Sequence, residues 1–539
     1  MPTLNWIGKE KVINHHRDVP FKILEHKYGF NDSDGQLKEP VNTGNKIIHG
    51  DNLEALKGLL PEYEGRIKCI YIDPPYNTGN ENWVYNDNVN HPKVKKWLEA
   101  TLKAKESGKE AGISIDDLAR HDKWLCMMYP RLKLLQKLLA DSGAIFISID
   151  DNEQANLKLI CDEVFGPANF ITDLIWRSAD SSNNDAKKFS IDYNHTLIYS
   201  KKTSWQPIKL SRSEDNNAHY KNPDNDPRGP WFSGNVSSPN PRKNLTFDLI
   251  SPDGTVIKPP KNGWRWSKER IDEMIESKEI VFSEDQTRII KKTFLKDQSG
   301  IVPSNIWWDV DETGHNRNAK YELMNIFSEL KTSELFKTPK PSKFIDKVLR
   351  VSIGPNDLVL DSFAGSGTTA HTVLNLNKRD GGNRKFILIE MEDYANTITA
   401  ERVKRVIKGY GDKEGTGGSF DYYELGKPLF IGENNEYLNE EVDTEKIREY
   451  IWYSETRKAF KRPQIKSDTP YFLGKKEGTA YYFIYEKESL TTLDYDTLSI
   501  IKTKAGQYVI YADNCLLPKD FMMKKNIVFK KIPRDVTRF

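Results

Sequence analysis

Short apolar runs that end in an acidic residue recur along the chain. Residues 46–51, 69–73, 143–150, 358–361 and 385–390 are such runs, and each has an aspartate or a glutamate in its last position. Nearly continuous apolar runs of this length are typical of the buried strands of a parallel sheet. Because stretches with apolar residues at helical spacing lie between the runs, the pattern predicts a doubly wound, Rossmann-like α/β sheet.

The remaining elements of this sheet domain follow from the same periodicities. Apolar residues at helical spacing predict helices at 52–60, 121–139, 154–165, 344–349 and 400–409. Two further apolar runs predict strands at 170–176 and 195–199.

The alternation is lost between residues 201 and 330. Prolines, glycines, tryptophans and basic residues dominate this interval, which predicts a separate, inserted domain. Basic residues interleaved with aromatic ones suit contacts with DNA phosphates and base edges. The same tryptophans would also suit the small core of an irregular structural domain.

Composition changes again after residue 425, where tyrosine, lysine and glutamate become frequent. A helix at 444–458 and strands at 479–485 and 507–511, whose aromatic residues look exposed, predict an α+β domain for assembly. The predicted regions are 1–44 (a polar, irregular N-terminal extension), 45–200 and 331–425 (two halves of the sheet domain), 201–330 (the inserted domain) and 426–539 (the assembly domain).

Net charge excludes few classes of function, whereas the cysteine content predicts the cellular compartment. The chain has 80 basic and 78 acidic residues among 539, a formal net charge of +2, so net charge alone does not indicate nucleic-acid binding. The 4 cysteines match no metal-ligand spacing, which predicts a reduced cytoplasmic setting and no metal site. No apolar run approaches the length of a membrane span, so no membrane association is expected.

The run at 69–73 continues into Asp73-Pro74-Pro75-Tyr76. Two consecutive prolines remove two backbone donors and fix φ, so neither a helix nor a paired strand continues through them. A rigid turn at the carboxyl edge of a sheet results, where ligands of open α/β folds bind. Its carboxylate, the Pro74 carbonyl and an aromatic ring suit a flat ring that carries an amino group. An ordinary turn with a solvated aspartate is the alternative.

The run at 358–361 leads into a second motif, a glycine turn followed by a helix. Glycines 365 and 367 allow a ligand to approach the backbone closely, and the following helix N-terminus favours a carboxylate. A phosphate-binding P-loop is excluded because Thr368 stands where that motif requires lysine.

Together, Asp-Pro-Pro-Tyr at 73–76 and Phe-Ala-Gly-Ser-Gly-Thr-Thr at 363–369 resemble the DPPY and FxGxG motifs of S-adenosylmethionine-dependent DNA amino-methyltransferases. The order of the motifs resembles the permuted β group of these enzymes, and the whole chain resembles the modification (Mod) subunit of type III restriction–modification systems. The resemblance implies catalytic roles for Asp73, Pro74, Pro75 and Tyr76. It implies contacts with S-adenosylmethionine for Asp51, Lys340, Pro341, Asp361, Phe363, Ala364, Gly365, Ser366, Gly367, Thr368, Thr369 and Glu390.

The resemblance also implies a function and partners. We expect methyl transfer to adenine N6 in double-stranded DNA, by base flipping and direct attack, with residues 201–330 as the target-recognition domain. Aspartate at position 73 favours adenine over cytosine N4, and the absence of a Pro-Cys dipeptide disfavours methylation of cytosine carbon. A homodimer and a separate ATP-dependent restriction subunit are the implied partners. A stand-alone methyltransferase, a cytosine-N4 enzyme and a non-catalytic DNA-binding subunit stay open.

One motif points to a different activity. Pro252-Asp253 followed by Glu276-Ser277-Lys278 fits the loose pattern of many nucleases. Because this pattern is short and degenerate, we attribute the match to chance and expect no nuclease site.

Overall fold

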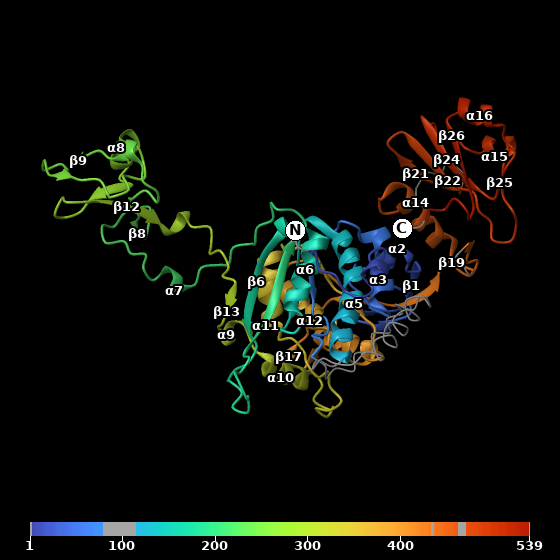
Figure 1. Cartoon of the computed structure of the whole chain (residues 1–539), viewed down its shortest axis with the longest axis horizontal. Helices are drawn as coiled ribbons and strands as arrows, with labels where there is room; N and C mark the ends of the chain where they lie inside the picture. The colour runs from blue at the N-terminus through green and yellow to red at the C-terminus, as the bar shows by residue number, and fades with distance from the viewer. Residues whose placement is uncertain (1–2, 79–114, 433–435, 462–469, 538–539) are drawn as a thin grey trace. The chain divides into compact units, whose positions relative to one another are not determined.

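The computed structural model describes residues 3–78, 115–432, 436–461 and 470–537 (Figure 1). It divides into a compact unit at Pro207–Pro303 and a larger unit formed by the rest of the chain. The polar sequence after Tyr76 predicts a loop at 77–85, and the many lysines and acids at 92–120 predict a solvated helical insertion; both segments lie mostly outside the described residues. Within the described ranges, no helix combines the length and apolar character needed to cross a membrane.

The larger unit is built on one mixed sheet, which has 11 strands in the part of the chain that is described. Their spatial order, from one edge to the other, is β13 (Ile306–Trp307), β6 (Phe170–Arg177), β7 (Tyr193–Ser200), β5 (Leu139–Ile149), β4 (Ile67–Ile72), β14 (Leu358–Asp361), β15 (Lys385–Glu390), β3 (Lys46–His49), β18 (Ser419–Pro428), β1 (Lys22–Asn31) and β2 (Gly35–Leu37). The central strands from β5 to β18 run parallel to one another, whereas β7 and β1, which flank them, are antiparallel to their neighbours. This arrangement confirms the predicted α/β class.

Helices cover both faces of the sheet. One group packs side by side: α3 (Asn52–Tyr63), α5 (Ile115–Leu138) and α6 (Gln154–Phe165). The second group is α11 (Ser342–Ser352), α12 (Thr368–Asp380) and α13 (Glu401–Lys408), which follows a π-helical turn at Ala395–Ala400. The two helix groups lie on opposite faces of the sheet, as alternate residues of β4 show. Ile70 and Ile72 belong to the core with α3 and α5, whereas Tyr71 contacts Phe344 of α11.

Strand order explains why a crevice forms at the centre of the sheet. From β4 the chain crosses over through α5 to β5 on one side, and from β14 it crosses through α12 to β15 on the other. Since parallel crossovers are right-handed, connections in opposite directions put their helices on opposite faces. The carboxyl ends of β4 and β14 therefore stand at the switch point of the sheet, where ligands of open α/β folds bind.

The N-terminal region differs from its prediction as an irregular extension. Residues Lys22–Asn31 form β1, which pairs antiparallel with β18 and extends the main sheet. The ring of Phe30 stacks on that of Phe420, and the ring of Tyr28 stacks on that of Tyr422. The strand was missed because glutamate, histidine and lysine interrupt its apolar alternation, and its partner lies far along the sequence.

The C-terminal region forms a small sheet with spatial order β21 (Phe472–Lys476), β22 (Thr479–Phe483), β24 (Gln507–Ala512) and β26 (Ile527–Lys531), after helix α14 (Thr444–Thr456). The expectation that its aromatic strands are exposed is wrong. Tyr482, Phe483 and Tyr511 are each at most 1% exposed. Helix α14 supplies the cover, since Tyr450 and Tyr453 belong to the same core as Phe483 and Tyr511.

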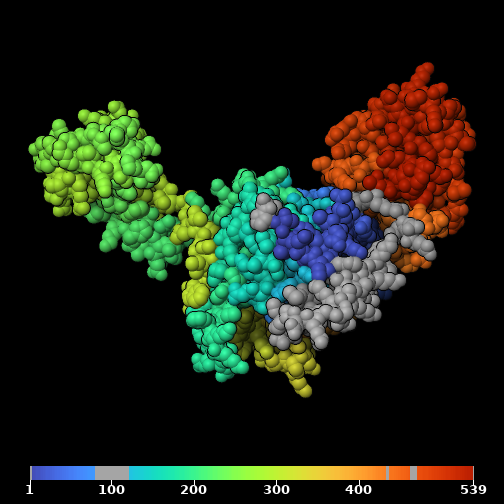
Figure 2. All heavy atoms as spheres, in the orientation of Figure 1, coloured from blue at the N-terminus to red at the C-terminus, as the bar shows by residue number. Residues whose placement is uncertain are grey.

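The unit at Pro207–Pro303, green to yellow-green in Figure 2, has a small hydrophobic core of its own. Its sheet has the order β11 (Ile280–Phe282), β12 (Ile289–Phe294) and β8 (Trp231–Gly234), and helix α8 (Lys268–Glu276) packs beside β11. Trp264 lies in this core with 2% exposure. The unit falls inside the predicted interval 201–330, and residues 304–330 belong to the larger unit.

Candidate active site

The two sequence motifs leave adjacent parallel strands. Val359 of β14 pairs with Cys69 of β4, and Leu360 pairs with Ile70. Each strand ends within two residues of this pairing, so the Asp73–Tyr76 turn and the loop after Asp361 emerge side by side at the carboxyl edge. The structure thus joins segments that are far apart in the sequence.

The turn that follows β4 is held from two sides. The indole nitrogen of Trp124, on α5, donates to the Pro75 carbonyl over 2.7 Å. Asn77 has φ +60° and is fully buried, and its side-chain amide donates to the carboxylate of Glu153, which is also fully buried. These contacts fix the backbone between Asp73 and Asn77 in one conformation.

Asp73 and Tyr76 share one partner, Lys340. The Lys340 ammonium lies 2.5 Å from Asp73 Oδ2 and donates to the Tyr76 hydroxyl over 2.9 Å. It also lies 5.0 Å from the centroid of the Tyr76 ring. Asp73 Oδ1 is buried and has no hydrogen-bond partner among the described residues. Burial, followed by the neighbouring Asp73 charge, raises the pKa of Tyr76 well above its ordinary value, so the phenol stays protonated.

The glycine loop needs glycine at both predicted positions. Gly365 has φ +51°, and a Cβ there would stand 2.9 Å from the Phe336 ring. Gly367 has φ +79°, and its Cβ would stand 3.0 Å from the Thr399 carbonyl oxygen. Both conformations are unfavourable for residues with a side chain, so glycine allows the loop to fold tightly.

The acid that ends β14 is buried under this loop. Asp361 accepts hydrogen bonds from the Phe363 amide over 3.1 Å and from the Thr369 hydroxyl over 2.5 Å. Burial raises the pKa of its carboxyl to about 7, and the charge of Asp73 adds to the shift. Phe363 and Ala364, which follow, are 8% and 6% exposed.

Glu390 ends the neighbouring strand β15 and turns toward the same loop. Its carboxylate accepts from the Gly365 amide over 2.7 Å and from the amides of Met391 and Glu392. Burial raises the pKa of Glu390 to about 7, although these three donors oppose the shift. A buried acid held by neutral donors at this edge suits hydroxyl groups of a ligand.

Asp51 follows β3, the next strand along. Its carboxylate caps α3 by accepting from the amides of Leu53 and Glu54 over 2.9 and 3.1 Å. Arg131 approaches its other oxygen at 3.5 Å. The capping role that the sequence suggested is therefore present in the structure.

One buried arrangement was not anticipated from the sequence. Arg402, on α13, is fully buried and donates to the hydroxyls of Ser366 and Thr368 over 2.9 and 2.8 Å. It also pairs with Glu322 at 3.2 Å, and Glu322 accepts from Ser342 at the start of α11. The pair thus links the glycine loop to the turn that carries Lys340 and Pro341. An arginine within the apolar stripe of 400–409 was the available sequence indication.

The nuclease-like motif has ordinary structural roles. Asp253 accepts from the Ser251 hydroxyl over 2.5 Å and from the Thr255 amide over 2.9 Å, which closes a local turn. Lys278 has φ +56° and offers its carbonyl to Arg228 over 2.8 Å. No cluster of metal-ligating side chains occurs among the described residues.

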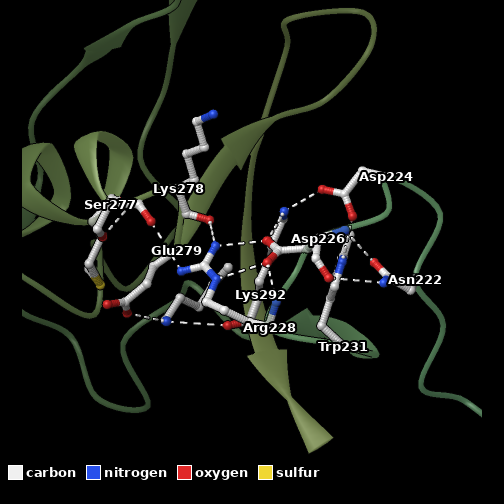
Figure 3. A network of polar contacts seen from close by, with 11 residues as sticks. Asn222, Asp224, Asp226, Arg228, Trp231, Ser277, Lys278, Glu279 and Lys292 are labelled. Atoms are coloured by element: carbon white, nitrogen blue, oxygen red, sulfur yellow. Dashed lines mark hydrogen bonds and ion pairs between the residues drawn. The ribbon is translucent and has the colours of Figure 1, made fainter.

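Arg228 belongs to a polar network inside the Pro207–Pro303 unit (Figure 3). Lys292, which is 3% exposed, contacts Asp224 and Asp226, and Arg228 binds Asp226 through two nitrogens at 2.9 and 2.8 Å. Arg228 also donates to the carbonyl of Ser277. This network ties β12 and the end of α8 to the loop before β8, so its charges stabilise the unit internally.

A doubly wound sheet with an acid-aromatic turn and a glycine loop at its switch point defines a methyltransferase-type α/β protein. The chain belongs to the DNA methylase family, whose model matches residues 67–401. It is similar to the StyLTI Mod subunit, a type III restriction-modification enzyme of Salmonella typhimurium, with 34% identity over 67% of this chain and 55% of that protein.

Two further relatives extend the comparison. The EcoP15I Mod subunit of Escherichia coli is 30% identical over 72% of this chain and 64% of its own length. The type II methyltransferase M.KpnI of Klebsiella pneumoniae is 31% identical over 68% of this chain and 85% of its own length. The alignments with the two Mod subunits thus span less than two thirds of their lengths.

Proposed function

We propose that this chain is a site-specific DNA methyltransferase that transfers a methyl group from S-adenosylmethionine to the N6 amino group of adenine in double-stranded DNA. One observation carries the proposal. The Asp73–Tyr76 turn and the Gly365–Gly367 loop end adjacent parallel strands at the switch point of the sheet. Because the chain belongs to the DNA methylase family, this pairing of turn and loop supports methyl transfer to DNA.

The target base binds beside Tyr76 after it has rotated out of the duplex. Its amino group donates to Asp73 Oδ1 and to the Pro74 carbonyl, while the Tyr76 ring stacks on the flat base. Acceptors on the amino protons draw the nitrogen toward tetrahedral geometry, so its lone pair is less conjugated with the ring and becomes available for attack. The Asp73 carboxylate then takes up the proton that the amino group releases.

The residues of the glycine loop fit the cofactor. Gly365 and Gly367 bring backbone close to a ligand, the N-terminus of α12 favours its carboxylate, and Glu390 suits its ribose hydroxyls. The resemblance adds Asp51 and Pro341 to these residues. S-adenosylmethionine, when bound, supplies an electrophilic methyl group. The protein contributes alignment and electrostatics, and no covalent enzyme intermediate is needed.

Recognition of the DNA sequence falls to the Pro207–Pro303 unit. Its separate core allows it to vary without disturbing the sheet. By similarity to the Mod subunits, we further propose that the chain is a modification subunit of a type III system, acts in the cytoplasm as a homodimer and meets a separate restriction subunit.

The similarity to M.KpnI favours a second candidate, a methyltransferase that works without a restriction subunit. To test the activity, purified protein is incubated with unmethylated DNA and S-adenosylmethionine in the absence of ATP. Sequencing with detection of modified bases should find N6-methyladenine at one recurring sequence. Methylation of cytosine N4 would overturn the assignment of adenine as the target base. DNA that stays unmodified would overturn the proposed methyltransferase activity.

A chimaera tests the recognition unit. Replacing Pro207–Pro303 with the matching segment of a relative should change the methylated sequence while the rate stays similar. An unchanged recognition sequence would contradict the assignment.

A further inference from the structure

Lys340 contacts the catalytic turn, although the resemblance assigned this lysine to the cofactor. Its ammonium lies 2.5 Å from Asp73 Oδ2 and 2.9 Å from the Tyr76 hydroxyl. These two side chains stand on the turn after β4, whereas Lys340 comes from the turn before α11. The lysine therefore connects the two halves of the site.

The ammonium is held in place rather than free to sample solvent. The Lys340 side chain is 9% exposed, so its charge is largely withdrawn from water and depends on its partners. The following turn is fixed, because the Ser342 hydroxyl donates to Glu322 over 2.6 Å and Glu322 pairs with Arg402. A lysine on a fixed turn can set the orientation of the group to which it is bound.

The ion pair also gives the two carboxylate oxygens of Asp73 different surroundings. Oδ2 is occupied by Lys340, while Oδ1 is buried and has no hydrogen-bond partner among the described residues. A buried carboxylate oxygen without a donor is costly, so this oxygen is suited to a donor that arrives with a ligand. Lys340 further offsets the negative charge of Asp73 close to the buried Asp361.

We propose that Lys340 is a positioning residue for methyl transfer: its ammonium holds Asp73 Oδ2 and the Tyr76 hydroxyl, so that Oδ1 receives the amino group of the target base. The inference rests on the proposed function and deepens it. Lys340 acts through Asp73 and Tyr76, and its loss should affect the rate of transfer far more than affinity for the cofactor.

The test uses the full chain with Lys340→Met, Lys340→Gln and Lys340→Arg. Lys343→Met is the matched control, because Lys343 lies three residues further along, is exposed and donates to the Asp311 carbonyl rather than to the Asp73–Tyr76 turn. Calorimetry measures the Kd for S-adenosylmethionine without DNA. Single-turnover methylation at saturating DNA and cofactor measures the transfer rate.

Lys340→Met and Lys340→Gln should lower the transfer rate by about 100-fold, the usual effect of removing one preorganised donor from an active site, while Kd changes less than about threefold. Lys340→Arg should recover at least about tenfold in rate because it retains the charge. Lys343→Met should match the unmodified protein.

Two results would overturn the inference while leaving the proposed function intact. One is a normal transfer rate in Lys340→Met and Lys340→Gln. The other is a Kd raised more than about tenfold, which would make Lys340 a cofactor-binding residue. An unmodified protein that transfers no methyl group overturns the proposed function itself, and the inference with it. If Lys340→Met does not fold, Lys340→Gln, which keeps a donor without a charge, decides between these outcomes.

Discussion

Replacing Arg402 with methionine should destabilise the cofactor half of the sheet and weaken cofactor binding. The guanidinium is fully buried and stands between Glu322, at 3.2 Å, and the hydroxyls of Ser366 and Thr368. Methionine fills a similar volume without hydrogen-bond donors, so the variant removes the charge and the donors together. Glu322 is left as a carboxylate with a side chain 17% exposed and without its ion-pair partner.

The size of the effect follows from this geometry. Removing one member of a buried ion pair costs about 3–5 kcal/mol, since the remaining charge stays desolvated. Burial alone would raise the pKa of Glu322, yet the Arg402 charge holds it below its usual value. An acid with a lowered pKa stabilises the fold above its ordinary pKa of 4.5, and that contribution is lost as the pH falls through the lowered value. The full cost should therefore appear near pH 7.

Urea denaturation, with the slope and the midpoint compared between variants, measures this cost. Arg405→Met is the matched control on the same helix, because Arg405 is 28% exposed and its pairs with Glu329 and Glu401 are worth only about 0.2–1 kcal/mol. Adding Glu322→Gln to Arg402→Met should recover about 1–3 kcal/mol, since no charge is then left unpaired. Equal losses for Arg402→Met and Arg405→Met, or strictly additive losses in the double variant, would refute the reasoning.

Three further outcomes are expected. Asp73→Asn should reduce methyl transfer at least about 100-fold with cofactor affinity unchanged by calorimetry, and a normal rate would remove Asp73 from the mechanism. The pKa of Glu390 is about 7 without ligand, and binding of hydroxyl groups favours the ionised form. Cofactor affinity measured by calorimetry should therefore fall as the pH drops below about 7, and the Glu390→Gln variant should lose this pH dependence. A pH-independent Kd in the unmodified protein would contradict this role of Glu390. Gly365→Ala should raise Kd by about 5- to 30-fold, because a left-handed conformation costs about 1–2 kcal/mol with a side chain, whereas Gly381→Ala, at φ +70° in open space, should leave Kd unchanged.

The central strands and both motifs could be predicted because their information is local. Runs such as Lys385–Glu390 are apolar between their two charged ends, and prolines at 74 and 75 end a strand in any context. Strand β1 could not be predicted, because its residues are amphipathic only in relation to β18, which lies almost 400 positions later in the numbering. The contact of Lys340 with Asp73 depends in the same way on a tertiary fold that brings two turns together. Local chemistry therefore predicts members of the candidate site, and the fold determines which of them touch.

The pairing of β4 with β14 has a consequence for how the chain acquires its structure during synthesis. In the sheet, β14 and β15 lie between β4 and β3, yet both are made only after the Pro207–Pro303 unit has been completed. Until then, the facing edges of β3 and β4 lack their partners and present unsatisfied backbone groups beside apolar side chains. Contacts that close over such long stretches of sequence form slowly. A nascent chain that stops before residue 358 would therefore expose a divided, aggregation-prone sheet, and the sheet can close only after β14 and β15 have been synthesised.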